Sequence, residues 1–452
     1  MMSIFKKLSQ NYNNIHLQSL LGNGVMAIFS MGTIVILYRA LSLKELGIYV
    51  FFMTLLGLID ALRAGFLTTS FIKFYSGTSK TRSRQVAGSA WGLAIIITGA
   101  CVLVNSIGLL FSSYINNQGL FFFIKYFTFI SLATLPWFMA NLVVQGEKRF
   151  DRLLWMRLIN QIVFTGAIFI LILLKKSTLD LIFTCYIVSN IVGSLATLVL
   201  GWTRFTSIKY YNKATVAEIF HFGKYSMGTS LSANLFHVTD TFFINFFLGP
   251  AALAIYNLAG KLLQIVEIPL LSFAASSMPE LSSHYNNNRR LDMVSLMMKL
   301  VGMLSILIFI IALVSNIFAE PMIKLLGGEK YLGTEAPNLF RILMTVAILY
   351  PAERFFALTL DVIHKPKVNF YKILVMLTVN LAGDYIGVAV FKSIYFIALV
   401  NFLPMIVSIT IAYYSLNRYI KFGFWNAYVI GYNEIMQFIR VRVFKKEPKI
   451  SK

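Results

Sequence analysis

The sequence has unusually few charged residues for its length. Charged residues fill 13% of the 452 positions, and hydrophobic residues fill 58%. A water-soluble globular chain is nearer a quarter charged, so this composition excludes a chain that folds only in water. The apolar residues fall in blocks of about 20, the length that a helix needs to cross a hydrocarbon core of ~30 Å. The composition therefore predicts a protein that crosses a membrane many times.

Cysteine and histidine are also scarce. The two cysteines, Cys101 and Cys185, both lie within apolar blocks, and the five histidines are widely scattered. A disulfide framework or a zinc site would need more thiols or clustered histidines. We interpret the cysteines as small packing residues, and we expect neither a metal nor a cofactor.

Acidic residues are few, and the formal net charge is +22. The basic residues form no continuous stripe of the kind that follows a nucleic-acid backbone. They lie in short loops between apolar blocks and in the C-terminal tail, which is the distribution of a topology signal. We therefore expect no nucleic-acid partner. The sequence also lacks a Walker loop and the HExxH and GxSxG motifs, so an enzyme is not expected.

Twelve apolar segments are predicted to be membrane helices. Each would satisfy its own backbone hydrogen bonds, as hydrocarbon requires. The predicted spans are 20–39, 46–72, 86–112, 120–144, 153–174, 179–201, 221–248, 252–279, 293–319, 338–361, 370–391 and 394–415.

A polar stretch in the middle of the chain separates six spans from six. The fold class that we expect is all-α, a polytopic membrane protein with two six-helix lobes around a central cavity. The tail is predicted to be a basic amphipathic segment on the inner leaflet, with a partly disordered tail as the alternative. The expected division is a cytoplasmic segment 1–19, a first lobe 20–202, a cytoplasmic linker 203–218, a second lobe 219–415 and the tail 416–452.

Lysine and arginine in the loops predict the orientation. With a cytoplasmic N-terminus, the predicted inside segments hold 24 lysines and arginines, and the outside segments hold 7. A wrong number of spans would mix the two classes of loop. We therefore expect both termini to be cytoplasmic.

Three basic residues are predicted to lie deep in the membrane: Arg63 in the second span, Lys125 in the fourth and Lys261 in the eighth. A central charge costs roughly 2.5–3.5 kcal/mol on insertion scales, so it persists where it faces a bundle interior or a wet cavity. Lys372 is nearer a cytoplasmic end and is expected to reach the membrane surface with its charged group.

Polar partners accompany these charges. Asp60 precedes Arg63 by three residues and shares its helix face. Three other spans carry polar residues: His237 and Asp240 in the seventh, Gln264 and Glu267 in the eighth, Glu353 and Arg354 in the tenth. They are either ion pairs that fix helix packing or the lining of a substrate path.

Deep basic groups are suited to an anionic cargo. A guanidinium group donates paired hydrogen bonds to phosphate, so a diphosphate that joins lipid to sugar would be a suitable cargo. We expect Arg63, Lys261 and Lys125 to contact it. Asp240 and Glu267 are then either counter-charges or binding groups for a coupling proton or sodium ion.

Several segments resemble one known family. They are Arg39–Tyr49, Gly57–Phe66 with Asp60 and Arg63, Phe222–Tyr225, Asp240, Leu248–Pro250, Ile255–Lys261, Met278–Ser282 and His364–Lys367. Their order and spacing resemble the polysaccharide transporters, or O-antigen flippases, of the multidrug/oligosaccharidyl-lipid/polysaccharide exporter superfamily. The start of the last span departs from the family's usual Gly-Ala pair, with Ser393 and Ile394 in that place.

The resemblance covers about 20–415 and implies alternating access in the bacterial inner membrane. The implied cargo is an undecaprenyl-diphosphate-linked oligosaccharide for lipopolysaccharide O-antigen, capsule, exopolysaccharide or a teichoic-type polymer. It also implies contact with membrane lipids and a polysaccharide polymerase as a partner. A monomer is the default expectation.

Three alternatives stay open. A multidrug antiporter of the same superfamily would usually carry an acidic residue in its first helix, and none lies between Leu20 and Tyr38. A lipid II flippase would have two more helices, which the sequence offers only if the tail is misinterpreted. A membrane polymerase or ligase would need a larger external loop than the one predicted at 320–337.

Overall fold

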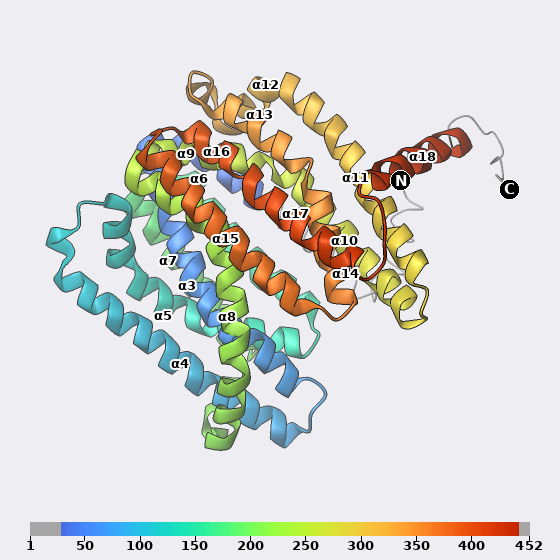
Figure 1. The fold of residues 1–452 in the computed structure, drawn as a ribbon. Coiled ribbons are helices and arrows are strands. Elements are labelled where there is room, and N and C mark those ends of the chain that lie inside the picture. The colour runs from blue at the N-terminus through green and yellow to red at the C-terminus, as the bar shows by residue number, and fades with distance from the viewer. Residues whose placement is uncertain (1–28, 443–452) are drawn as a thin grey trace, which may run out of the picture. The chain divides into compact units, whose positions relative to one another are not determined.

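The computed structural model describes residues 29–442, without the side chains at 225, 228–230, 232, 233, 236, 237 and 438–442. The described residues form helices joined by short loops, and they contain no strand (Figure 1). The predicted all-α fold is confirmed. The chain divides into two compact units, with the boundary between Asn234 and Leu235.

The first unit begins, in its described part, with the helix Phe29–Ala40. A capping box at Ser42 starts the next helix, because Ser42 Oγ accepts from the Glu45 amide and the Glu45 carboxylate accepts from the Ser42 amide. The elements that follow are α3 (Leu43–Tyr75), α4 (Lys80–Leu110), η1 (Ser112–Tyr114), α5 (Gln118–Gly146), α6 (Phe150–Leu173), α7 (Leu179–Val199), η2 (Phe205–Tyr210) and α8 (Lys213–Phe243), which crosses the unit boundary.

The second unit continues from α8 through a π-helical turn, η3 (Ile244–Leu248), and a sharp turn at Gly249, whose φ of +91° favours glycine. Pro250 then occupies the first helical position of the next helix, where its missing N–H costs nothing. The remaining elements are α9 (Pro250–Leu262), α10 (Gln264–Asn286), α11 (Arg290–Ile317), α12 (Ala319–Gly327), η4 (Glu329–Tyr331), α13 (Ala336–Ala347), α14 (Tyr350–Val362), α15 (Pro366–Ala389), α16 (Ile394–Val400), α17 (Phe402–Asn417) and α18 (Asn426–Arg442).

Eight spans in the described part of the chain are long and apolar enough to cross a membrane, and two bent pairs raise the number to ten. The bent pairs are α9 with α10, at 45°, and α13 with α14, at 40°. They coincide with the predicted spans 252–279 and 338–361, which are therefore broken rather than straight. The predicted spans 20–39 and 221–248 coincide with the helix Phe29–Ala40 and with α8 and η3, in part outside the described residues.

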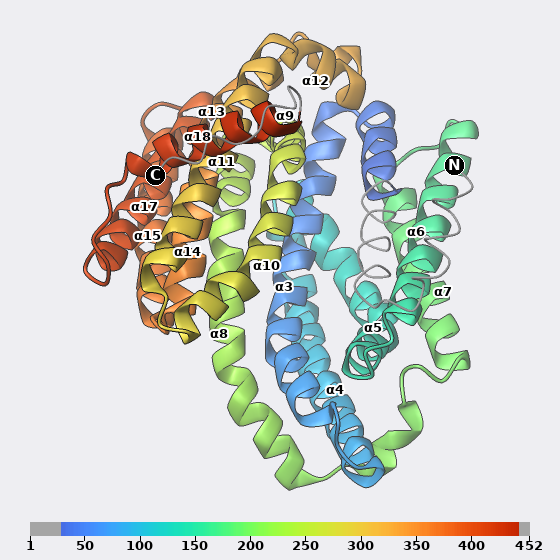
Figure 2. The ribbon, with the colours of Figure 1, turned by 90° about the vertical axis from the view of Figure 1, so that its right-hand side faces the viewer.

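The core of the first unit lies between α3, α4 and α5, which run side by side (Figures 1 and 2). Phe71, Trp91 and Met139 are among its buried side chains. The segment predicted as a linker, 203–218, belongs to this unit and packs on α4. The Trp91 indole donates to the Thr203 carbonyl at 2.9 Å, and the Ser89 hydroxyl bonds to the backbone of Asn212.

The core of the second unit includes side chains of α10, α11, α14 and α17, such as Phe355 and Met297. The tail helix α18 packs on α11. A Cβ atom on Gly302 would lie 1.9 Å from the Ala427 carbonyl oxygen, so the two backbones approach as closely as glycine permits. Lys299 and Glu434 form an ion pair at 2.9 Å beside this contact. One face of the predicted surface helix is therefore occupied by protein.

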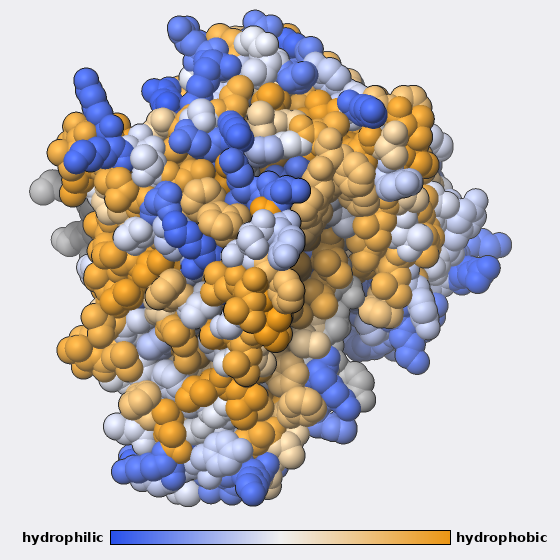
Figure 3. Space-filling view, turned by 90° about the vertical axis from the view of Figure 1, so that its left-hand side faces the viewer, coloured by the Kyte–Doolittle hydropathy of each residue, from blue (hydrophilic) through white to orange (hydrophobic). Residues whose placement is uncertain are grey.

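Large apolar side chains face outward from the membrane-length helices. Leu110, Val199 and Ile317 are among the most exposed of them. On the face shown in Figure 3, wide areas of hydrophobic residues surround smaller groups of hydrophilic residues. Such surfaces are stable in hydrocarbon and not in water, so the chain is a multi-pass membrane protein.

Candidate functional site

Arg63 lies on α3, with only 7% of its surface exposed. Its Nη2 donates to Asp60 Oδ1 at 2.7 Å and to Thr134 Oγ1 at 3.2 Å, and its guanidinium stacks over the Phe138 ring at 4.5 Å. The predicted pairing with Asp60 is therefore present, and the Asp60 side chain is 57% exposed. Nε and Nη1 of Arg63 have no hydrogen-bond partner among the described residues, so this cation keeps donors for another acceptor.

Lys125 lies on α5, and the structure pairs it with a carboxylate that the sequence analysis did not single out. Its Nζ is 2.6 Å from Asp180 Oδ1 in the first turn of α7, and the Tyr126 hydroxyl donates to the same oxygen. Both charged side chains are about half exposed. Asp180 also precedes the helix's apolar run, where a negative charge is favourable next to the helix dipole.

The second unit holds a polar cluster centred on the half-buried Asp240 of α8. The Asp240 carboxylate accepts from the Tyr256 hydroxyl, from Asn380 Nδ2 at 3.0 Å and from Asn401 Nδ2 at 3.2 Å. Asn380 Nδ2 also lies 3.0 Å from an oxygen of Asp384, which is fully buried. Four elements thus contribute to one site: α8, α9, α15 and the junction between α16 and α17.

Two oxygens of this cluster are buried without a partner. They are Asp384 Oδ1 and Asn380 Oδ1, and both belong to α15. In the described chain, no lysine, arginine or histidine forms an ion pair with Asp240 or Asp384. A buried carboxylate without a counter-charge is costly, so such a site gains free energy by taking up a proton or a cation. Carboxylate and amide oxygens are the ligands that hard cations take.

The bend between α9 and α10 carries three predicted residues. Lys261 is the penultimate residue of α9, Gln264 begins α10, and Glu267 lies one turn further on; all three are partly exposed. Glu267 acts on the Lys261 ammonium electrostatically. Within residues 29–442 the Lys261 ammonium has no ion pair within 4 Å and no hydrogen bond, so it is available to an anion.

Glu353 of α14 belongs to a different arrangement. Its Oε1 accepts from Lys372 Nζ at 2.8 Å and from the Ser408 hydroxyl at 3.2 Å. Lys372 is 1% exposed. The expectation that Lys372 reaches the membrane surface was therefore wrong, because α15 turns its charge inward to Glu353. Arg354, the next residue, is exposed.

Several residues of these clusters were not predicted, and the side chain of His237 lies outside the described residues. Asn380 and Asp384 had a signal, since a spacing of four puts both on one helix face. Asn401 and Tyr256 had none, because their role depends on which helices meet.

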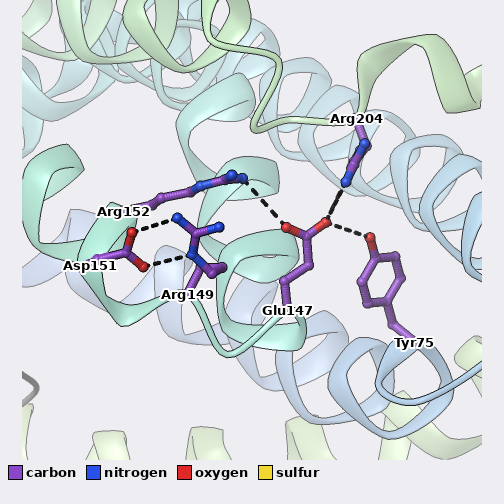
Figure 4. A network of polar contacts seen from close by, with 6 residues as sticks. All are labelled: Tyr75, Glu147, Arg149, Asp151, Arg152 and Arg204. Carbon is purple, nitrogen blue, oxygen red and sulfur yellow. Dashed lines mark hydrogen bonds and ion pairs between the residues drawn. The ribbon is translucent and has the colours of Figure 1, made fainter. Parts of the chain in front are cut away.

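A surface network joins the ends of α3, α5 and α6 (Figure 4). The Glu147 carboxylate accepts from the Tyr75 hydroxyl at 3.1 Å and from Arg204 at 2.8 Å, and it lies 3.6 Å from Arg152. The hydrogen bond from Arg204 to Glu147 raises the pKa of that guanidinium. Arg149 makes a separate, bidentate ion pair with Asp151.

The model of one protein family, described as polysaccharide biosynthesis protein, matches residues 16–285, which is more than half of the chain. The chain belongs to this family. A second family model, MatE, matches residues 226–386. No curated protein matches the sequence significantly.

Solved structures show the same fold. An inward-facing multidrug resistance MATE family transporter of the MOP superfamily has a TM-score of 0.70 at 14% identity, over 87% of this chain and 95% of the other. The lipid II flippase MurJ, in an inward closed conformation, has a TM-score of 0.69 at 13% identity, over 95% of this chain and 93% of the other. A MOP superfamily transporter from Pyrococcus furiosus has a TM-score of 0.54 at 14% identity, covering 89% and 94%.

These matches confirm the resemblance found in the sequence. The family member described here has the fold of MOP superfamily transporters and flippases. Its relatives are transporters rather than enzymes, which agrees with the absence of motifs for hydrolysis or group transfer.

Proposed function

We propose that this protein moves a lipid-linked oligosaccharide from the cytoplasmic to the outer face of the bacterial inner membrane, by alternating access. The observation that carries the proposal is the match to the polysaccharide biosynthesis family over 16–285. The cargo would be an undecaprenyl-diphosphate-linked oligosaccharide that supplies a surface polysaccharide. A polymerase would use the product on the outer face, and the protein would act as a monomer with both termini cytoplasmic.

The diphosphate would be held by basic groups at membrane depth. Lys261 is the strongest candidate because its ammonium has no ion pair within 4 Å and no hydrogen bond in the described chain, and because it lies where α9 and α10 break. Arg63 retains two unengaged donors, Nε and Nη1, while Asp60 and Thr134 hold its third nitrogen. Lys125 would have to leave Asp180 to contribute, so we rank it third.

A deletion strain tests the cargo. Loss of surface polysaccharide, with an undecaprenyl-diphosphate oligosaccharide accumulating on the cytoplasmic face, would support the proposal, and mass spectrometry would identify the sugar. Complementation with Lys261→Gln at normal abundance should lower polymer yield roughly tenfold or more, since one charge-assisted hydrogen bond contributes about 1.5–3 kcal/mol. Exposed Arg354→Gln is the matched control and should complement fully.

We further propose that a monovalent cation drives the transport and binds at Asp240, Asn380 and Asp384. A proton or a sodium ion would satisfy the two partnerless oxygens and offset the buried charge. This ion is cargo rather than a resident cofactor. Glu267, the other acidic residue predicted for coupling, would act as a counter-charge to Lys261 instead.

Thermal unfolding of the detergent-purified protein tests the coupling ion. A ligand at 100 times its Kd stabilises by about 2.7 kcal/mol, so NaCl should raise the unfolding midpoint relative to choline chloride. The rise should vanish in Asp384→Asn and persist in Asp292→Asn, an exposed acid of α11. A midpoint that responds to pH in wild type and not in Asp384→Asn, without a sodium effect, would assign a proton. No response to either would refute the coupling proposal.

A multidrug exporter is the second candidate, favoured by the MatE match over 226–386 and by the structural likeness to MATE transporters. If the deletion strain kept its surface polymer and became sensitive to cationic drugs, this candidate would replace the first. The carboxylates of the second unit would then be the binding groups for the drug or its counter-ion.

A further inference from the structure

The first unit contains a basic cavity that neither proposed transport path uses. It has a volume of about 390 Å³ and lies between the start of α4 and the segment 204–210. Four cations line it, Lys80, Arg84, Arg204 and Lys209, together with hydroxyl groups such as those of Ser83 and Thr206. Among the described residues, no acidic side chain lines it. The Glu147 carboxylate, which is not among the lining groups, accepts a hydrogen bond from Arg204 at 2.8 Å.

The charge arrangement around the start of α4 is unfavourable without an anion. The first turn of a helix attracts negative charge because the helix dipole is positive there. The first turn of α4 has no acidic residue, and Lys80, Arg82 and Arg84 follow one another within five positions. Arg82 is neutralised by Glu218, whereas Lys80 and Arg84 have no ion pair among the described residues and face the cavity. A bound anion would offset both the dipole and these charges.

The cavity wall is held firmly. A Cβ atom on Gly88 would lie 2.2 Å from the Ser207 carbonyl oxygen, so η2 rests directly on the backbone of α4. Arg204 has a φ of +50°, a left-handed conformation that is unfavourable for arginine, and Glu147 fixes its guanidinium through two hydrogen bonds. A rigid wall with fixed cations loses little entropy on binding a ligand.

The position of the cavity indicates the kind of ligand. It lies where α3 ends and α4 begins. Both helices are long and apolar enough to cross a membrane, so we expect the cavity to lie near the lipid headgroups. Exposed aromatic residues flank it: Phe205 is 53% exposed and Tyr211 is 45% exposed. Aromatic and basic residues together are typical of a protein surface at headgroup level. The end concerned is the one that the loop charges predict to be cytoplasmic.

We propose that this cavity binds the phosphate group of a membrane lipid. Arg84 and Lys209 provide the charge, the Thr206 hydroxyl provides a neutral donor, and Arg204 is oriented by Glu147. The lipid is either an anionic glycerophospholipid or the diphosphate lipid on which the cargo is built. Both present the same phosphate chemistry, and the site does not depend on which cargo the protein moves.

Native mass spectrometry of the full-length protein tests the proposal. Detergent-purified protein would be titrated with phosphatidylglycerol, phosphatidylcholine and undecaprenyl diphosphate, and the retained lipids counted. Arg84→Gln with Lys209→Gln should weaken the binding of an anionic lipid about tenfold or more, because each surface cation contributes roughly a fivefold factor. Arg84→Lys with Lys209→Arg should restore binding, which separates lost charge from altered folding. Lys175→Gln with Lys176→Gln, at the other end of the unit, is the matched control.

The lipid that the double variant loses shows which of the two lipids supplies the phosphate group. Selective loss of phosphatidylglycerol assigns a glycerophospholipid, and selective loss of undecaprenyl diphosphate assigns the diphosphate lipid. Equal binding by wild type and the double variant would overturn the proposal, as would an equal loss in the control pair. Failure here would leave the proposed transport function untouched, since that function is tested by the precursor in the deletion strain.

Discussion

At the scale of single residues, burial alone did not separate packing charges from charges available to a ligand. Arg63 and Lys372 are both nearly inaccessible and each pairs with a carboxylate, but Asp60 beside Arg63 is 57% exposed, whereas Glu353 beside Lys372 is 23% exposed. Lys261 is less buried, and no ion pair or hydrogen bond holds it in the described chain. What distinguishes these cations is the inventory of partners around each, which depends on neighbouring helices and cannot be deduced from one span.

The pair of Lys372 and Glu353 gives a stability prediction. Removing one member of a buried ion pair leaves an uncompensated charge and costs about 3–5 kcal/mol. Lys372→Met should therefore lower the unfolding midpoint of the purified protein sharply. Adding Glu353→Gln should recover most of the loss, because the remaining groups are neutral.

Lys367→Met is the control for this experiment, since Lys367 is exposed on the same helix, α15. It should leave the midpoint nearly unchanged. If Lys372→Met proved as stable as Lys367→Met, the ion pair would contribute nothing and the inward orientation of Lys372 would need another cause.

At the scale of helices, breaks and close contacts matter more than span length. The bend after α9 places Lys261 and Gln264 at a helix end rather than inside a continuous span. Hydropathy indicates a span here without indicating the break, because both halves are apolar. The contact between α11 and α18 was not predicted either, because the sequence pattern indicated only a separate amphipathic segment.

The glycine contact between α11 and α18 makes a second stability prediction. In Gly302→Ala the new methyl group would meet the Ala427 carbonyl, a backbone atom that cannot move without its helix. We expect a cost of about 1–3 kcal/mol from overpacking and faster hydrogen exchange in α18. Gly99→Ala in α4, where no atom lies within 4 Å of the added carbon, should be neutral or slightly stabilising. Unchanged exchange in α18 would contradict the contact.

At the scale of the whole molecule, the sequence predicted much of the fold. The predicted spans coincide with helices wherever the structure describes them, because hydrocarbon leaves a helix few alternatives. The candidate sites were predicted less well. Asp60 with Arg63 came from spacing along one helix, whereas Asp240 with Asn380 and Asn401 required three helices to meet. Contacts between helices depend on side-chain packing, and the pattern of apolar residues within one predicted span does not show which other span it meets.

The orientation of the whole molecule in the membrane is the last prediction, and the basic cavity depends on it. The predicted inside segments hold 24 lysines and arginines and the outside segments hold 7, which favours cytoplasmic termini. In a variant whose Cys101 and Cys185 are replaced by alanine, a cysteine at Lys330 should react with an impermeant maleimide in intact cells. A cysteine at Lys148 should react only after lysis, because that loop would face the cytoplasm.

The reverse labelling pattern would mean that the protein has the opposite orientation in the membrane, with Lys148 outside and Lys330 in the cytoplasm. The four cations of the cavity would then face the outer leaflet, where a lipid newly delivered across the membrane, rather than one awaiting transport, would meet them. Labelling of both positions in intact cells would indicate an even number of spans between them and would contradict the division into twelve, which places five spans there. Because nine predicted spans end before Lys330 and four end before Lys148, the two positions should lie on opposite sides of the membrane whenever the helices are assigned correctly.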